Sequence, residues 1–113
     1  MNAPAVGFSQ AIHVGNTVYC SGQVSTAEGL EAQAREAFTN VRTLLAYAGA
    51  TMSDIVKMTI YSTDDSCWQK TAGIRTEFLK PPFPAATMVI VKGLARPEFL
   101  IEVDVTAVIG AGH

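Results

Sequence analysis

Two carboxylates near the end of the chain are the side chains best placed for acid–base chemistry. Glu102 lies within an apolar segment, and Asp104 follows two positions later. In a β-strand such residues point to the same face, about 7 Å apart. A pair at this separation can serve as general base and acid; the alternative is that both carboxylates line a solvated sheet face. If another subunit covers that face, partial burial raises the pKa of Glu102 toward that of a general base.

A hydroxyl beside a flexible backbone is the second candidate. Ser21 and Gly22 follow an apolar run that ends at Cys20. Glycine lets the backbone approach a ligand closely, so the pair is suited to lining a binding site. Ser21 as a nucleophile would need a nearby base, which the sequence does not identify. A turn-forming Ser-Gly pair is the alternative.

The histidines and cysteines do not form a pattern of metal ligands. His13 and His113 lie near opposite ends of the chain, and Cys20 and Cys67 show no CxxC spacing. We therefore expect no metal site and two free thiols, which suits a reducing compartment.

Alternating and helical hydrophobic patterns predict the elements that carry these residues. A strand pair joined by a turn at Gly15-Asn16 is expected first, and the three later strands are mostly apolar. Apolar residues at three- and four-residue spacing predict two helices. The expected strands are 8–23 (as a hairpin), 54–61, 85–92 and 99–109, and the expected helices are 30–48 and 64–79.

Three finer expectations concern which residues face the core. In the third strand, Val56, Met58 and Ile60 are expected on one side. In the second helix, the expected core face consists of Trp68, Ala72, the stem of Arg75, Phe78 and Leu79. In the last strand, the odd-numbered residues from Phe99 to Ile109 face one way, and the tail from Gly110 to His113 is expected to fray.

The element order β-β-α-β-α-β-β predicts an α+β fold with two helices on one face of a sheet. The length fits a single domain over residues 1–113. The strands at 54–61 and 85–91 have few charges on either face, so we expect the face opposite the helices to be buried against copies of the same chain.

Composition excludes several classes of function. Hydrophobic residues make up 49% of the chain and charged residues 16%, against roughly 25% charged in an ordinary domain. No apolar run reaches the roughly 18 residues of a membrane span. The net charge of −2 and the scattered basic residues make nucleic acid an unfavourable partner. The N-terminus lacks a signal peptide pattern, which predicts a cytoplasmic location.

Several segments together resemble the Rid family of reactive-intermediate deaminases, also called YjgF or endoribonuclease L-PSP proteins. They occur in the family's order over nearly the whole chain. The segments are Gly15-Asn16, Val18-Tyr19-Cys20-Ser21-Gly22-Gln23, the helix 31–41, the strand 54–61, Phe83-Pro84-Ala85 and Ile101-Glu102-Val103.

The resemblance implies a chorismate-mutase-like fold in which three subunits pack their sheets into a barrel, with small-molecule ligands bound in clefts between subunits. Family deaminases hydrolyse 2-imino acids or their enamine tautomers without a cofactor. The resemblance assigns Glu102 to positioning or activating water. The substrate-binding positions that it implies are Phe8, Tyr19, Ser21, Gly22, Ala86, Thr87 and Met88.

Four positions depart from the family pattern. The arginine that clamps the substrate carboxylate should follow Phe-Pro-Ala directly, where this chain has Ala86, and the pocket cysteine corresponds to Met88. A tyrosine corresponds to Phe8 and an asparagine to Ala72. Loss of the clamp should weaken binding of a 2-imino carboxylate about a hundredfold or more. Arg96, in the loop before the last strand, is a candidate replacement.

The sequence is therefore compatible with three functions. The first is a deaminase-type hydrolase that uses Glu102 on a small imine, enamine or related metabolite and is not a standard 2-imino acid deaminase. The second is a non-catalytic binding or regulatory trimer. The third, an endoribonuclease, is disfavoured by the acidic charge balance.

Overall fold

The computed structural model describes residues 8–112 of the chain. Residues 1–7 and His113 lie outside the described residues. Residues 1–7 contain most of the N-terminal segment on which the expected cytoplasmic location rests.

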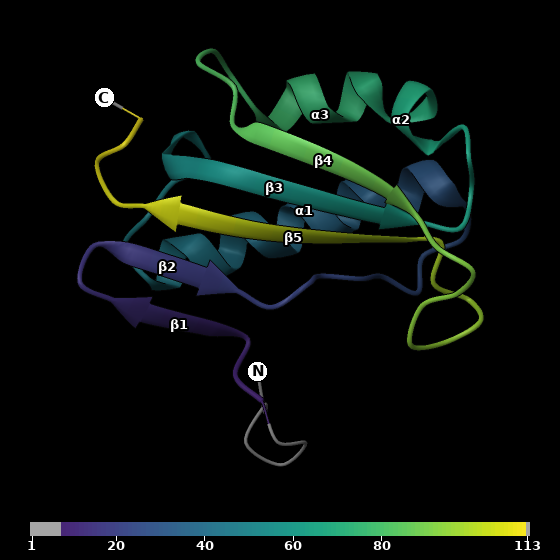
Figure 1. Cartoon of the computed structure of the whole chain (residues 1–113), viewed down its shortest axis with the longest axis horizontal. Coiled ribbons are helices and arrows are strands. Elements are labelled where there is room, and N and C mark those ends of the chain that lie inside the picture. The colour runs from purple at the N-terminus through teal and green to yellow at the C-terminus, as the bar shows by residue number, and fades with distance from the viewer. Residues whose placement is uncertain (1–7, 113) are drawn as a thin grey trace.

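Five strands form one sheet in the order β1-β2-β5-β3-β4 (Figure 1). Neighbouring strands are antiparallel except β3 and β4, which run parallel. The turn between the first two strands contains Gly15 with a φ of 58°, which favours glycine. The strands are β1 (Ala11–Val14), β2 (Thr17–Cys20), β3 (Ile55–Ser62), β4 (Ala85–Ile90) and β5 (Ile101–Val108).

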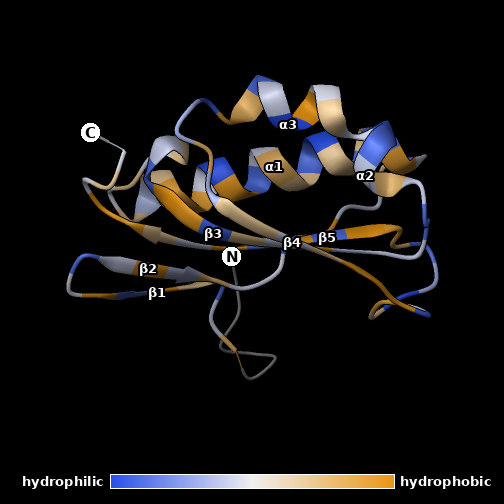
Figure 2. Ribbon diagram, turned by 45° about the horizontal axis from the view of Figure 1, so that its top comes forward, coloured by the Kyte–Doolittle hydropathy of each residue, from blue (hydrophilic) through white to orange (hydrophobic). Residues whose placement is uncertain are grey.

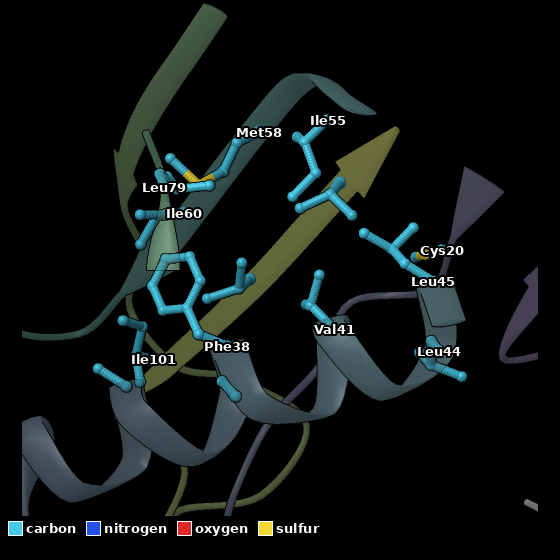
Figure 3. Close-up of a cluster of buried hydrophobic side chains, with 14 of the residues drawn as sticks. Cys20, Phe38, Val41, Leu44, Leu45, Ile55, Met58, Ile60, Leu79 and Ile101 are labelled. Carbon is cyan, nitrogen blue, oxygen red and sulfur yellow. The ribbon is translucent and has the colours of Figure 1, made fainter. Parts of the chain in front are cut away.

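The helices lie on one face of this sheet (Figure 2), which confirms the expected α+β architecture. The long helix α1 (Leu30–Tyr47) packs its apolar stripe on the sheet, with Phe38, Val41 and Leu45 fully buried (Figure 3). Its periodicity over five turns defines a single buried face. Gly49, with a φ of 84°, follows the helix end.

The second expected helix is divided in two and rotated. It consists of α2 (Cys67–Lys70) and α3 (Ala72–Phe78), joined at Thr71. The buried stripe is Cys67, Thr71 and Ile74, whereas Trp68 and Ala72 are exposed, so the expected core face was wrong there. Thr71 can be buried because its hydroxyl donates a hydrogen bond to the Cys67 carbonyl.

Strand β5 alternates as predicted. Ile101, Val103 and Val105 are buried under the helices, while Glu102 and Asp104 point to the opposite, open face of the sheet. The open face is thus defined here as the sheet face without helices. Both cysteines, Cys20 and Cys67, are buried free thiols, as expected.

Two strands differ from expectation. An irregularity in the pairing of β3 with β5 falls between Ile55 and Lys57 and leaves Val56 39% exposed, so Val56 does not share the core face of Met58 and Ile60. Strand β4 was expected to be buried but lies at the edge of the sheet and is mostly exposed in a single chain.

The expected frayed tail is instead held in place up to Gly112. The buried Asp54 carboxylate accepts hydrogen bonds from the backbone N–H groups of Gly110 (3.1 Å) and Gly112 (3.2 Å), and from that of Thr51 (3.0 Å). These bonds connect the chain end to the short 3-10 helix η2 (Met52–Asp54) that precedes β3.

None of the helices within residues 8–112 is long and apolar enough to cross a bilayer.

Candidate active site

Glu102 lies against the backbone of Gly22. The segment after β2 runs beside β5 because Gln23 and Val103 exchange two backbone hydrogen bonds, of 2.8 and 2.9 Å. This pairing places Gly22 so close to Glu102 that a Cβ atom added to the glycine would lie 2.6 Å from the Glu102 Cδ. Only a residue without a side chain fits beside the carboxylate in this arrangement.

The surroundings of Glu102 favour its protonated form. Burial raises the pKa of Glu102 above its ordinary value, and the neighbouring Asp104 carboxylate raises it further. The pKa of Asp104 is itself raised by burial. Burial and Asp104 also raise the pKa of the Cys20 thiol to about 11. A carboxylate with an elevated pKa is better able to take a proton and return it during a reaction.

The Ser21 hydroxyl is held by the N-terminal segment. It donates a 2.6 Å hydrogen bond to the Ser9 carbonyl, and the Ser21 N–H donates to the Gln10 carbonyl at 2.7 Å. Since the hydroxyl proton is given to a carbonyl and not to a base, this hydrogen bond does not activate Ser21 as a nucleophile. Its oxygen remains free to accept a hydrogen bond from a ligand or water.

The two aromatic candidates for substrate binding are Tyr19 and Phe8. Tyr19 pairs with Thr106 on the open face and is 52% exposed. Phe8 precedes β1 and is 48% exposed. Both rings are accessible from outside a single chain.

The candidates on β4 divide between the two sheet faces. In register, Ala86 lies beside Met58 and Met88 beside Ile60, so both share the helix-covered side. Thr87 lies on the open face, where its hydroxyl accepts a 2.6 Å hydrogen bond from the Lys57 Nζ. Glu102 and Ala86 therefore point to opposite sides of the sheet and do not meet within one chain.

A pocket of about 300 Å³ opens beside Ala86, between the edge of the sheet and helices α2 and α3. Its walls are mainly apolar. The lining residues are Met58, Trp68, Arg75, Thr76, Leu79, Phe83, Pro84 and Ala86.

Arg75 is the residue of this pocket that the sequence did not single out. It was expected only to cover the core with its stem, yet its guanidinium lies 3.5 Å from the centre of the Trp68 ring. Trp68 lies in α2 and Arg75 in α3, so the contact joins the two short helices across Thr71. Arg96, the expected replacement cation, instead pairs with Glu98 at 2.7 Å.

Among residues 8–112, no three side chains of His, Cys, Asp or Glu come close enough to hold a metal ion.

Comparison with known sequences finds relatives that belong to one family. The family model described as Endoribonuclease L-PSP matches residues 1–109. A 2-iminobutanoate/2-iminopropanoate deaminase of Dermatophagoides farinae is 35% identical over 82% of this chain and 79% of its own length. The RutC family protein YjgH of Escherichia coli is 36% identical over 85% of this chain and 79% of its own.

Solved structures of similar proteins lead to the same family. Rv2704 of Mycobacterium tuberculosis, a member of the YjgF/YER057c/UK114 family, superimposes with a TM-score of 0.89 at 32% identity, covering 95% of this chain and 91% of its own. RidA of Psychrobacter superimposes with a TM-score of 0.87 at 33% identity, covering 91% and 89%. The family match over residues 1–109 and the structural superposition lead to one conclusion: the chain belongs to the Rid family, also named YjgF or endoribonuclease L-PSP.

Proposed function

We propose that the protein is a cofactor-independent hydrolase of the deaminase type, acting on a small imine or enamine with apolar substituents. The observation that carries the proposal is Glu102, a half-buried carboxylate pressed on the Gly22 backbone with a raised pKa. An isolated surface carboxylate would have neither property.

In the proposed reaction Glu102 acts as general base. Its carboxylate takes a proton from water as the water oxygen attacks the carbon of the C=N bond. That proton passes to the nitrogen and gives a carbinolamine. Glu102 then takes the proton of the new hydroxyl group and delivers it to the amino group as the C–N bond breaks, so that a carbonyl compound and ammonia leave. One water is consumed, and no electron donor or acceptor is required. A positioned base of this kind contributes roughly 10²–10⁴-fold to the rate.

The active site is proposed to lie in a cleft between subunits of a homotrimer. Because Glu102 and Ala86 point to opposite sides of the sheet, one ligand can contact both only if they come from different copies. The exposed edge strand β4 and the uncovered sheet face are the surfaces that such packing would use. The expected mass in light scattering is about 36 kDa, three times the 12.0 kDa of the chain; a 12 kDa particle at micromolar concentration would contradict the shared cleft.

Relatives support the reaction class and not the substrate. One curated relative is named as a 2-iminobutanoate/2-iminopropanoate deaminase. Ala86, in place of the arginine implied by the family resemblance, and the apolar pocket beside it favour a ligand with a larger apolar part. The family description as an endoribonuclease fits this chain less well, because its net charge of −2 does not attract a phosphate backbone.

A non-catalytic binding trimer is the second candidate, and the mainly apolar walls of the pocket favour it. Imine hydrolysis separates the two functions. Imines generated in solution from several amino acids and amines are followed by ammonia release, with wild type beside Glu102→Ala and Glu102→Gln. The proposal predicts acceleration by wild type and a loss of at least about a hundredfold in both variants. Binding without acceleration of any imine would instead support the regulatory trimer.

A further inference from the structure

Gln23 is a buried amide that uses only one of its two ends. The residue is 8% exposed, and its Nε2 group donates hydrogen bonds to the Gln10 Oε1 at 3.0 Å and to the Ser21 carbonyl at 2.9 Å. Its Oε1 atom accepts none from the described part of the chain. A second buried glutamine, Gln33, uses both ends, because its nitrogen donates to two backbone carbonyls and its oxygen accepts the Leu100 N–H. The unpaired oxygen of Gln23 is therefore an acceptor available to a ligand.

The free oxygen of Gln23 is open to a pocket of about 250 Å³ that this residue lines. Every side-chain nitrogen or oxygen that is sealed from solvent within residues 8–112 has a hydrogen-bond partner, so an unpaired oxygen on this side chain must reach the pocket. The other lining residues are Gln10, which precedes β1, and Asn40 and Thr43 of helix α1. All four lining side chains are polar and none is charged.

This polar pocket is separate from the candidate active site. Gln23 pairs with Val103, whose side chain is buried under the helices, whereas Glu102 points to the open face. The short segment that ends at Gln23 therefore has the polar pocket on one side and the Glu102 carboxylate on the other. The polar pocket shares no lining residue with the larger, apolar pocket beside Ala86.

The free polar atoms of the pocket define the chemistry of a ligand that fits. Asn40 and Thr43 each donate to a backbone carbonyl, at 3.4 and 3.1 Å, so both keep an oxygen that can accept, as Gln23 does. The Gln10 amide is used the other way round: its oxygen accepts from Gln23, so its NH₂ group can donate. Several acceptors, one donor group and no charge complement an H₂N–C=O group, which has two N–H donors and one carbonyl oxygen. A carboxylate would bring negative charge against these oxygens, and a ketone would leave them unpaired.

We propose that this pocket is a second ligand site, which binds a small neutral molecule through a primary amide or urea group. The N–H groups of the ligand donate to the Gln23 and Asn40 oxygens, and its carbonyl accepts from the Gln10 NH₂ group. The proposed hydrolysis does not use this site, so the two proposals stand or fall separately.

Binding can be followed at the pocket itself, because the side-chain NH₂ groups of glutamine and asparagine give their own signals in a nitrogen–proton correlation NMR spectrum. Three probes of nearly the same shape are titrated into the wild-type protein: propionamide, propionate and butanone. Propionamide should shift the side-chain signals of Gln10, Gln23 and Asn40 and leave those of Gln33 in place. Propionate and butanone should bind at least about tenfold more weakly, since each loses the N–H donors.

Variants of helix α1 test the lining. Asn40→Leu removes one acceptor and should weaken propionamide binding roughly two- to tenfold, the worth of one neutral hydrogen bond. Thr39→Val is the control, because Thr39 precedes Asn40 on the same helix but does not line the pocket, and it should bind as wild type does. If Asn40→Leu does not fold, Thr43→Phe, which fills the pocket from an exposed position, should exclude propionamide.

Two results would overturn the inference: wild type that binds the three probes equally or not at all, or a folded Asn40→Leu or Thr43→Phe variant with the wild-type affinity for propionamide. Failure of imine hydrolysis would count against the proposed reaction and leave this second site standing.

Discussion

Replacing Gly22 by alanine should displace the proposed base without unfolding the protein. The new Cβ would lie 2.6 Å from the Cδ of Glu102 and 2.8 Å from its Cγ, whereas ordinary contact begins at 3.4 Å. The carboxyl carbon would therefore retreat by about 0.8 Å. A misplacement of about 1 Å at a reacting group can cost about 10²-fold in rate, and we expect a loss of this size in Gly22→Ala.

Stability should change little, because the atoms that must move belong to a flexible side chain and Gly22 does not have the positive φ that favours glycine. Removing a glycine also restricts the unfolded chain, which contributes about 0.4–1 kcal/mol in the opposite direction. Urea unfolding is measured first to establish that Gly22→Ala is folded. Ammonia release from an imine that wild type hydrolyses is then compared at several pH values.

The pH profile gives a second readout. In wild type the raised pKa of Glu102 should set an acidic limb above its ordinary value of 4.5. Pushed toward water, the carboxylate of Gly22→Ala should titrate at lower pH. Gly73→Ala is the matched control, since Gly73 lies in α3 with no atom within 4 Å of its added Cβ, and it should keep the wild-type rate. A folded Gly22→Ala with the wild-type rate and pH profile would refute the role of this contact.

Three further predictions concern ionisation. Asp54→Asn should lower the free energy of unfolding at pH 7 by about 1.5–3 kcal/mol, because the backbone hydrogen bonds to the Asp54 carboxylate are charge-assisted. Although burial raises the pKa of Asp54, these bonds hold it below the ordinary 3.8. In urea titrations the stability difference between wild type and variant should therefore shrink as acid protonates the wild-type carboxylate. Glu102→Gln should be more stable than wild type at pH 7 in the same titration. The raised pKa of Glu102 means that wild type takes up a proton on folding, so its stability falls as the pH rises above 4.5. Equal unfolding curves of the two proteins at pH 7 would contradict this. Cys20, with a pKa of about 11, should resist a disulfide reagent at pH 8 in the native protein and react once unfolded; rapid native labelling, with Cys20→Ser as control, would show that the thiol is accessible.

The long periodic elements could be predicted from sequence. Apolar residues recur at helical spacing along α1 and at every second position along β5, so each element has one face that can be buried. The second helix was less determined, because Trp68 and Ala72 are apolar and gave a plausible but wrong face. The true stripe contains Thr71, whose burial depends on a bond to its own backbone that composition does not reveal.

The candidate site was only partly accessible to sequence reasoning. The carboxylates Glu102 and Asp104 stand out in an apolar strand, and alternation placed them on the face opposite the buried odd-numbered residues. That Ala86 points to the other side depends on the register between β3 and β4, which pattern alone does not set. Arg75 was missed because a lone arginine on a helix usually covers the core with its stem, and only the contact with Trp68 distinguishes it.

Mixing two inactive variants tests most directly whether the site is shared between subunits. Glu102→Gln removes the proposed base, and Ala86→Trp fills the pocket on the opposite side of the sheet. Each variant alone should be inactive in the ammonia assay. When they are unfolded together and refolded at equal concentrations, random assembly should restore about one quarter of the wild-type activity, since one in four subunit contacts then joins an intact Glu102 to an open pocket. Recovery at that level is the predicted result; mixed trimers verified by mass spectrometry that remain inactive would contradict a site built from two subunits.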